Sequence, residues 1–65
     1  MSLDTRPDDV ATKAETLLRA GRFSEAAGEF RRAEALYTYD RDPGAAAQMV
    51  EAAITAQRAY EVQPL

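Results

Sequence analysis

The stretch Gly21-Arg22-Phe23-Ser24-Glu25-Ala26-Ala27 decides how this chain folds, because it contains the signals that end one helix and begin the next. Gly21 is expected to end the first helix, since glycine readily adopts the left-handed backbone that follows many helices. Ser24 is the candidate N-cap of a second helix, with Glu25 in its first turn. Because so few residues separate the two helices, they are expected to form an antiparallel hairpin.

Upstream of this stretch, a helix is expected over residues 6–20. Thr5 can cap its start, and Asp8, three residues later, resembles the second half of a capping box. Pro7 suits the first helical turn, because its missing amide hydrogen has no partner there in any case. Apolar side chains then recur at helical spacing, at Val10, Ala14, Leu17 and Leu18.

Downstream of the stretch, a second helix is expected over residues 24–39. Its apolar stripe is formed by Ala26, Phe30, Ala33 and Tyr37. Gly28 lies inside this helix, where glycine costs roughly 1 kcal/mol relative to alanine. Its expected use is to let a neighbouring helix approach closely.

A third helix is expected over residues 43–61. Asp42 is its natural N-cap, Pro43 its first helical residue, and Pro64 prevents its continuation. Its polar stripe is narrow, so alanines and larger apolar residues cover more of its circumference than one neighbouring hairpin needs. The chain is therefore predicted to be all-α, a single domain over residues 1–65 built as an antiparallel three-helix bundle.

Composition limits what so small a domain can do. The chain has 65 residues, of which 46% are apolar, and a net charge of −3. Much of the apolar content is alanine, so the stability margin is expected to be thin and to benefit from a partner or a second copy. The apolar runs are too short to span a bilayer, and the acidic charge argues against nucleic-acid binding.

The sequence lacks the side chains that most catalytic and metal sites use. There is no histidine and no cysteine, and no glycine-rich phosphate loop. The two serines, Ser2 and Ser24, have no base at a suggestive spacing. We therefore expect no enzymatic activity, no metal and no cofactor.

Arginines gather around the first hairpin, at Arg19, Arg22, Arg31 and Arg32. Acidic residues lie at helical spacing from them, which favours a solvated surface over a nucleic-acid site. The expected ion pairs are Glu15–Arg19, Arg22–Glu25 and Glu29–Arg32.

Cellular context is also expected from composition. A cysteine-free chain is compatible with a reducing cytoplasm, and the polar, acidic segment 1–9 does not have the pattern of a signal peptide. The chain is rich in alanine and arginine and poor in lysine, which indicates a GC-rich bacterial genome.

Residues 21–26 resemble the turn of a tetratricopeptide (TPR) repeat, and the resemblance extends over about residues 7–37. It rests on small and large residues in the family's order: Ala14, Leu17, Gly21, Phe23, Ala26, Phe30 and Ala33. Lys13 and Thr38 stand where the family usually has leucine and proline. The chain thus resembles one degenerate repeat followed by an extra helix.

The chain as a whole is similar to the MIT (microtubule interacting and trafficking) domain. This resemblance rests on residues 21–27 and on Gln57-Arg58-Ala59-Tyr60-Glu61 at the end of the third helix. Both families are non-catalytic protein-binding scaffolds, so the resemblance implies a protein or peptide partner. The MIT resemblance further implies that a partner helix docks along the third helix.

Partner-binding residues are predicted on the third helix and among the tyrosines. One stripe of the third helix has i, i+4, i+7, i+11 spacing and is either a docking groove or the core face: Met49, Ala53, Ala56 and Tyr60. Tyr37, Tyr39 and Tyr60 either anchor a partner or close the bundle end. Two functions remain open, which are docking of a partner helix or peptide along the third helix and homo-oligomeric assembly through its alanine-rich face.

Overall fold

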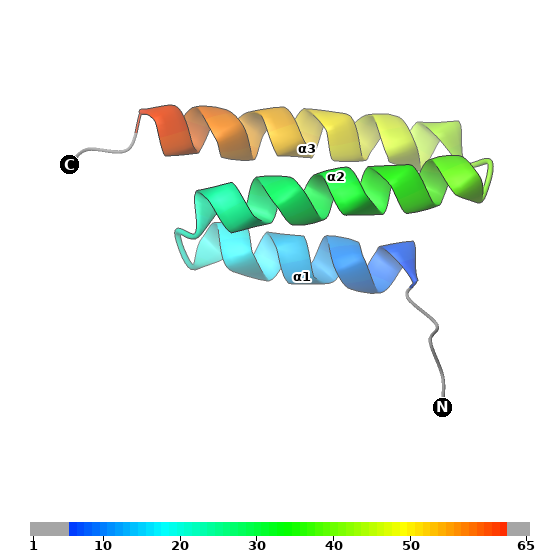
Figure 1. The fold of residues 1–65 in the computed structure, drawn as a ribbon, viewed down its shortest axis with the longest axis horizontal. Coiled ribbons are helices and arrows are strands. Elements are labelled where there is room, and N and C mark those ends of the chain that lie inside the picture. The colour runs from blue at the N-terminus through cyan, green and yellow to red at the C-terminus, as the bar shows by residue number, and fades with distance from the viewer. Residues whose placement is uncertain (1–5, 63–65) are drawn as a thin grey trace.

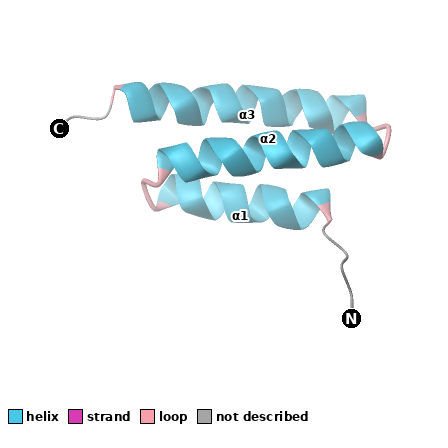
Figure 2. Cartoon of the chain, viewed as in Figure 1, coloured by secondary structure: helices cyan, strands magenta, loops and turns pink. Residues whose placement is uncertain are grey.

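The chain forms three helices, each antiparallel to the one before it, shown by sequence colour in Figure 1 and by secondary structure in Figure 2. This computed structural model describes residues 6–62. Helix α1 spans Pro7–Arg19, α2 spans Phe23–Tyr39 and α3 spans Pro43–Glu61. The predicted all-α, three-helix bundle is confirmed, and the helices begin and end within one residue of the expected positions.

The turn between α1 and α2 closes with the two hydrogen bonds of a Schellman motif. The amide of Gly21 donates to the carbonyl of Leu18 at 3.1 Å, and the amide of Arg22 donates to the carbonyl of Leu17 at 2.9 Å. Gly21 has a φ of 80°, which is the left-handed conformation expected of it. Glycine is suited to this position because it has no Cβ to clash with the backbone.

Ser24 does not cap α2, so that prediction is wrong. The helix begins at Phe23, and Arg22 occupies the N-cap position without a side-chain hydrogen bond. The reason is that Arg22 also closes the preceding turn, so helical geometry begins before Ser24 is reached. At the start of α1 the N-cap is Arg6, again without a side-chain hydrogen bond, and Thr5 lies outside the described residues.

The turn between α2 and α3 repeats this geometry with arginine in place of glycine. The amide of Arg41 donates to the carbonyl of Thr38 at 3.0 Å, and that of Asp42 donates to the carbonyl of Tyr37 at 2.9 Å. Arg41 has a φ of 61°, which is uncommon for a residue that carries a Cβ. Asp42 caps α3 as predicted, because its Oδ1 accepts from the amide of Ala45 at 3.2 Å.

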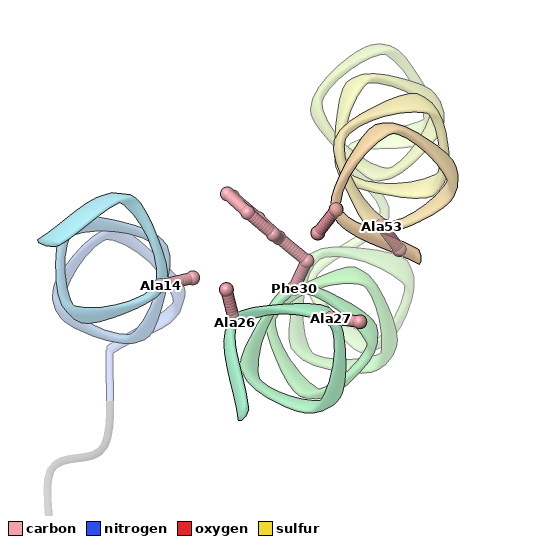
Figure 3. Packing of buried hydrophobic residues seen from close by; sticks show 6 residues of the cluster. Ala14, Ala26, Ala27, Phe30 and Ala53 are labelled. Carbon is pink, nitrogen blue, oxygen red and sulfur yellow. The ribbon is translucent and has the colours of Figure 1, made fainter. Parts of the chain in front are cut away.

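Helix α2 lies between α1 and α3 and packs against both (Figure 1). In Figure 3, Ala14 of α1 faces Ala26 of α2, while Phe30 projects from α2 into the space between α1 and α3. Phe30 is 2% exposed and is the large side chain that lies deepest in the described part of the chain. A single phenylalanine therefore joins the packing of all three helices.

The core is built mainly of alanine. Its buried residues within 6–62 are Val10, Ala11, Ala14, Ala26, Ala27, Phe30, Ala33, Ala46, Ala53 and Ala56. Alanine lets helices approach closely but removes little apolar area from water, so each contact contributes little free energy. The molecule is flat, with extents of 40 × 27 × 12 Å, because α1 and α3 touch each other only sparsely.

Gly28 does not mark a close helix contact, which corrects the expectation from sequence. The residue is exposed, and a Cβ added to it would meet no neighbouring atom within 4 Å. The neighbouring Ala26 and Ala27 make the buried contacts instead. Gly28 therefore lowers the stability of α2 without a packing benefit.

Candidate functional site

Three of the predicted partner-binding residues, Met49, Ala53 and Ala56, face into the molecule. Ala53 is 3% exposed and Ala56 is 0% exposed, and both belong to the core cluster that contains Phe30. Met49 is half-buried and packs against this cluster and against the one around Val10. These side chains hold α3 on the rest of the chain, so they leave almost no surface of the two alanines for a partner to contact.

The predicted tyrosines differ in their surroundings. Tyr37 is half-buried, and its hydroxyl donates a hydrogen bond of 2.5 Å to Oδ1 of Asp8. This hydrogen bond, together with burial and the negative charges of Asp8 and Asp42, raises the pKa of Tyr37 to about 12. Tyr39 is 86% exposed and Tyr60 is 55% exposed, so both present their rings to solvent.

Tyr39 and Tyr60 lie at opposite ends of the α2–α3 pair. Tyr39 is the last residue of α2, and Tyr60 is the next-to-last residue of the antiparallel α3. Tyr60 borders a shallow depression of about 240 Å³ beside the turn between α1 and α2. The three tyrosines therefore do not form one site.

A groove between α2 and α3 is the surface that the sequence did not reveal. Three adjoining hollows of about 600, 280 and 290 Å³ follow it from one end to the other. Glu34 and Val50 line both the first and the second hollow, and Arg31 and Ile54 line both the second and the third. These shared residues make the hollows one continuous surface, which we call the α2–α3 groove.

The centre of the α2–α3 groove is apolar. Val50 and Ile54 are 41% and 46% exposed, although both are large β-branched residues. They lie one helical turn apart on α3, and both line the middle hollow, where Ala53 lies beside them. Adjoining exposed apolar side chains in a hollow are typical of an interaction surface, whereas scattered ones are ordinary.

Charged side chains of both signs surround this apolar centre. They are three arginines and two glutamates, namely Arg31, Arg41, Arg58, Glu34 and Glu61. Nη2 of Arg31 donates to Oε1 of Gln57 at 3.1 Å, which links the two walls. Within residues 6–62, none of these five charged side chains forms an ion pair with another described residue.

The ion pairs expected around the first hairpin form only in part. Arg22 Nε lies 2.6 Å from Glu25 Oε2, as predicted. Across residues 6–62, Glu15–Arg19 and Glu29–Arg32 do not come within ion-pairing distance, so these two predictions are wrong. The physical reason is that exposed pairs gain little Coulomb energy and lose side-chain entropy when they form.

The signal for the groove lies in the sequence one position away from the predicted stripe. Val50 and Ile54 directly follow Met49 and Ala53 and have the same four-residue spacing. The alanines of α3 lie around most of its circumference. Apolar periodicity therefore does not reveal which of its two neighbouring stripes α2 covers. Only the packing of α2 against α3 distinguishes them.

Within residues 6–62, no group of three or more acidic side chains is arranged to hold a metal ion. None of the three helices there combines the length and the hydropathy needed to cross a membrane.

No protein-family model matches the chain, and no curated protein or solved structure matches it either.

Proposed function

We propose that this chain is a non-catalytic protein-interaction module that binds a partner helix or peptide in the α2–α3 groove, along α3. The observation that carries the proposal is the exposure of Val50 and Ile54 at the centre of the groove. An apolar centre with a polar rim is the usual arrangement of a protein–protein interface. The resemblance to TPR and MIT domains, which are both protein-binding scaffolds, supports the same function.

The dimensions of the groove support a helical ligand. Helix α3 has 19 residues, which corresponds to a length of about 28 Å. The hollows follow it from Pro43 to Glu61, so a partner helix of similar length can lie along it. Ala47 lies in the same wall as Val50, and its small side chain permits close approach of a second helix axis.

The predicted stripe has a supporting part in this proposal. Met49, Ala53 and Ala56 fix α3 against α2, which turns Val50 and Ile54 toward the open groove. From composition, we place this module in a bacterial cytoplasm.

Two glutamate substitutions one residue apart test the proposal. Ile54→Glu puts a charge in the centre of the groove, whereas Thr55→Glu puts the same charge on the neighbouring exposed position of α3. The tagged chain and both variants are used to capture proteins from the native lysate, with circular dichroism to verify folding. We expect Ile54→Glu to weaken capture by about thirtyfold, as for a central interface residue, and Thr55→Glu to leave it unchanged.

Equal capture by the two folded variants would contradict the proposal. A loss of capture with Thr55→Glu but not with Ile54→Glu would place the binding surface on the neighbouring exposed face of α3, outside the groove.

A further inference from the structure

The order of charges along the α2–α3 groove identifies its occupant. Resting on the proposed function, we infer that the groove binds the same groove of a second copy of this chain, in antiparallel orientation. The groove contains both signs in nearly equal number, so it suits neither a strongly acidic nor a strongly basic ligand. It suits a partner that has the same charges in reverse order.

The residues at the centre of the groove have a self-complementary order. Val50 and Glu34 lie together toward the end near the α2–α3 turn, because both line the first and the middle hollows. Ile54 and Arg31 lie together toward the other end, because both line the middle and the third hollows. Each half of the centre thus contains one apolar side chain and one charge, and the two charges have opposite sign.

A twofold axis between these halves reverses the order of residues in the second copy. Val50 then faces the second copy's Ile54, and Glu34 faces the second copy's Arg31. An isologous interface contains every contact twice, so two apolar pairs and two ion pairs form at its centre. A parallel twofold arrangement would instead put Glu34 and Arg31 at the same level as the second copy's Glu34 and Arg31, so neither ion pair would form.

The ends of the groove agree with this antiparallel arrangement. Arg41 lines the end near the turn, while Glu61 lines the other end. The same axis brings Arg41 toward the second copy's Glu61. Arg58 also lines that far end, so charges of both signs are present there. The register of the dimer is therefore set by the contact between Arg31 and the second copy's Glu34.

The energetics of the single chain favour a second copy. Within residues 6–62 its core is alanine-rich, with Phe30 as its one fully buried large side chain. Two α2–α3 pairs packed face to face form a four-helix bundle that buries Val50 and Ile54 in both copies. A typical interface buries about 800 Å² on each partner. That is about a sixth of the 4928 Å² accessible surface of the chain.

The predicted ion pair between Arg31 and the second copy's Glu34 is tested by reversing each charge in turn and then mixing the two variants. Arg31→Glu alone places two carboxylates against each other, and Glu34→Arg alone places two guanidinium groups against each other. An equimolar mixture of the two variants restores both ion pairs in a heterodimer. Sedimentation equilibrium from micromolar to millimolar concentration measures the dimer dissociation constant of each sample, and circular dichroism verifies helicity. Arg32→Glu is the matched control, because Arg32 is exposed on the same helix outside the groove.

We expect each single variant to raise the dissociation constant by about tenfold. The mixture should return to the wild-type value, and Arg32→Glu should not change it. A wild-type chain that remains monomeric at millimolar concentration overturns the inference. A mixture that dissociates like the single variants, or a dimer that is insensitive to Ile54→Glu, also overturns it.

These outcomes separate this inference from the proposed function. A monomeric wild type whose capture of another protein is lost in Ile54→Glu overturns the second copy as occupant and leaves the docking function supported. An Ile54→Glu variant that changes neither self-association nor capture overturns both.

Discussion

The hydroxyl of Tyr37 in the last turns of α2 donates a 2.5 Å hydrogen bond to Oδ1 of Asp8 in the first turn of α1. The two residues are 29 positions apart, so this contact exists only when the α1–α2 hairpin is closed. It holds the open ends of the two helices together at the side opposite their connecting turn. The contact therefore reports on the integrity of the hairpin.

Loss of this hydrogen bond is expected to destabilise the chain modestly. Tyr37→Phe removes the donor and should lower the free energy of unfolding by about 1 kcal/mol, because the bond is exposed to water. Chemical denaturation followed by circular dichroism measures the change. Tyr39→Phe is the control, since Tyr39 is 86% exposed and its substitution should have no effect. Equal effects of the two substitutions would show that the bond does not contribute.

The same contact predicts a pH dependence. The pKa of Tyr37 is raised from 10.0 to about 12, so the folded chain favours the neutral phenol more than the unfolded chain does. The stabilisation is complete below pH 10 and is lost as the pH rises through about 12. We expect wild type to lose more stability across this window than Tyr37→Phe. If wild type and Tyr37→Phe lost the same amount of stability across this pH window, the pKa shift of Tyr37 would not contribute to folding.

Phe30 is expected to contribute more to stability than any other side chain. Phe30→Ala removes the large residue between α1 and α3 and should cost about 3–5 kcal/mol, which is enough to unfold so small a domain. Val62→Ala deletes apolar volume at a position that is 77% exposed and should change little. Thermal unfolding of both variants checks the difference. A folded Phe30→Ala variant with the wild-type Tm would show that α1 and α3 are held by other contacts.

The two glycines Gly21 and Gly28 should respond to alanine in opposite directions. Gly28 lies in a helix with open space around it, so Gly28→Ala should stabilise the chain by about 1 kcal/mol. Gly21 has a φ of 80°, so Gly21→Ala should destabilise it by about 1–2 kcal/mol. Both variants add one methyl group, so each serves as the control for the other. The same sign for both would contradict the backbone assignments.

Arg41 provides an independent test of the second turn. Its φ of 61° is easily adopted by glycine, so Arg41→Gly should stabilise the chain by up to about 1 kcal/mol. Arg41→Ala removes the same side chain without relieving the backbone and should not stabilise it. The free energies of unfolding of the two variants, measured side by side, separate backbone strain from loss of the guanidinium group.

Local signals in the sequence predicted most of the fold. Gly21 and Asp42 act on backbone groups within a few residues of themselves, and the structure confirms both roles. Ser24 failed as a cap because the preceding Schellman turn already ends at Arg22. The left-handed Arg41 gave no signal, because arginine does not mark such a position and only the repeated turn geometry requires it.

The candidate site depended on information beyond local sequence. The sequence by itself determined that α3 is long, is apolar around most of its circumference and begins with Asp42 as its cap and Pro43 as its first residue, because capping and proline geometry act locally. Only the tertiary structure decided which stripe of α3 is covered. Contact with α2 buries Ala53 and Ala56 and leaves Val50 and Ile54 exposed in the groove. The physical reason is that small alanines on every side make the two stripes nearly equivalent in hydropathy, so that the fit of side chains between the helices chooses between them.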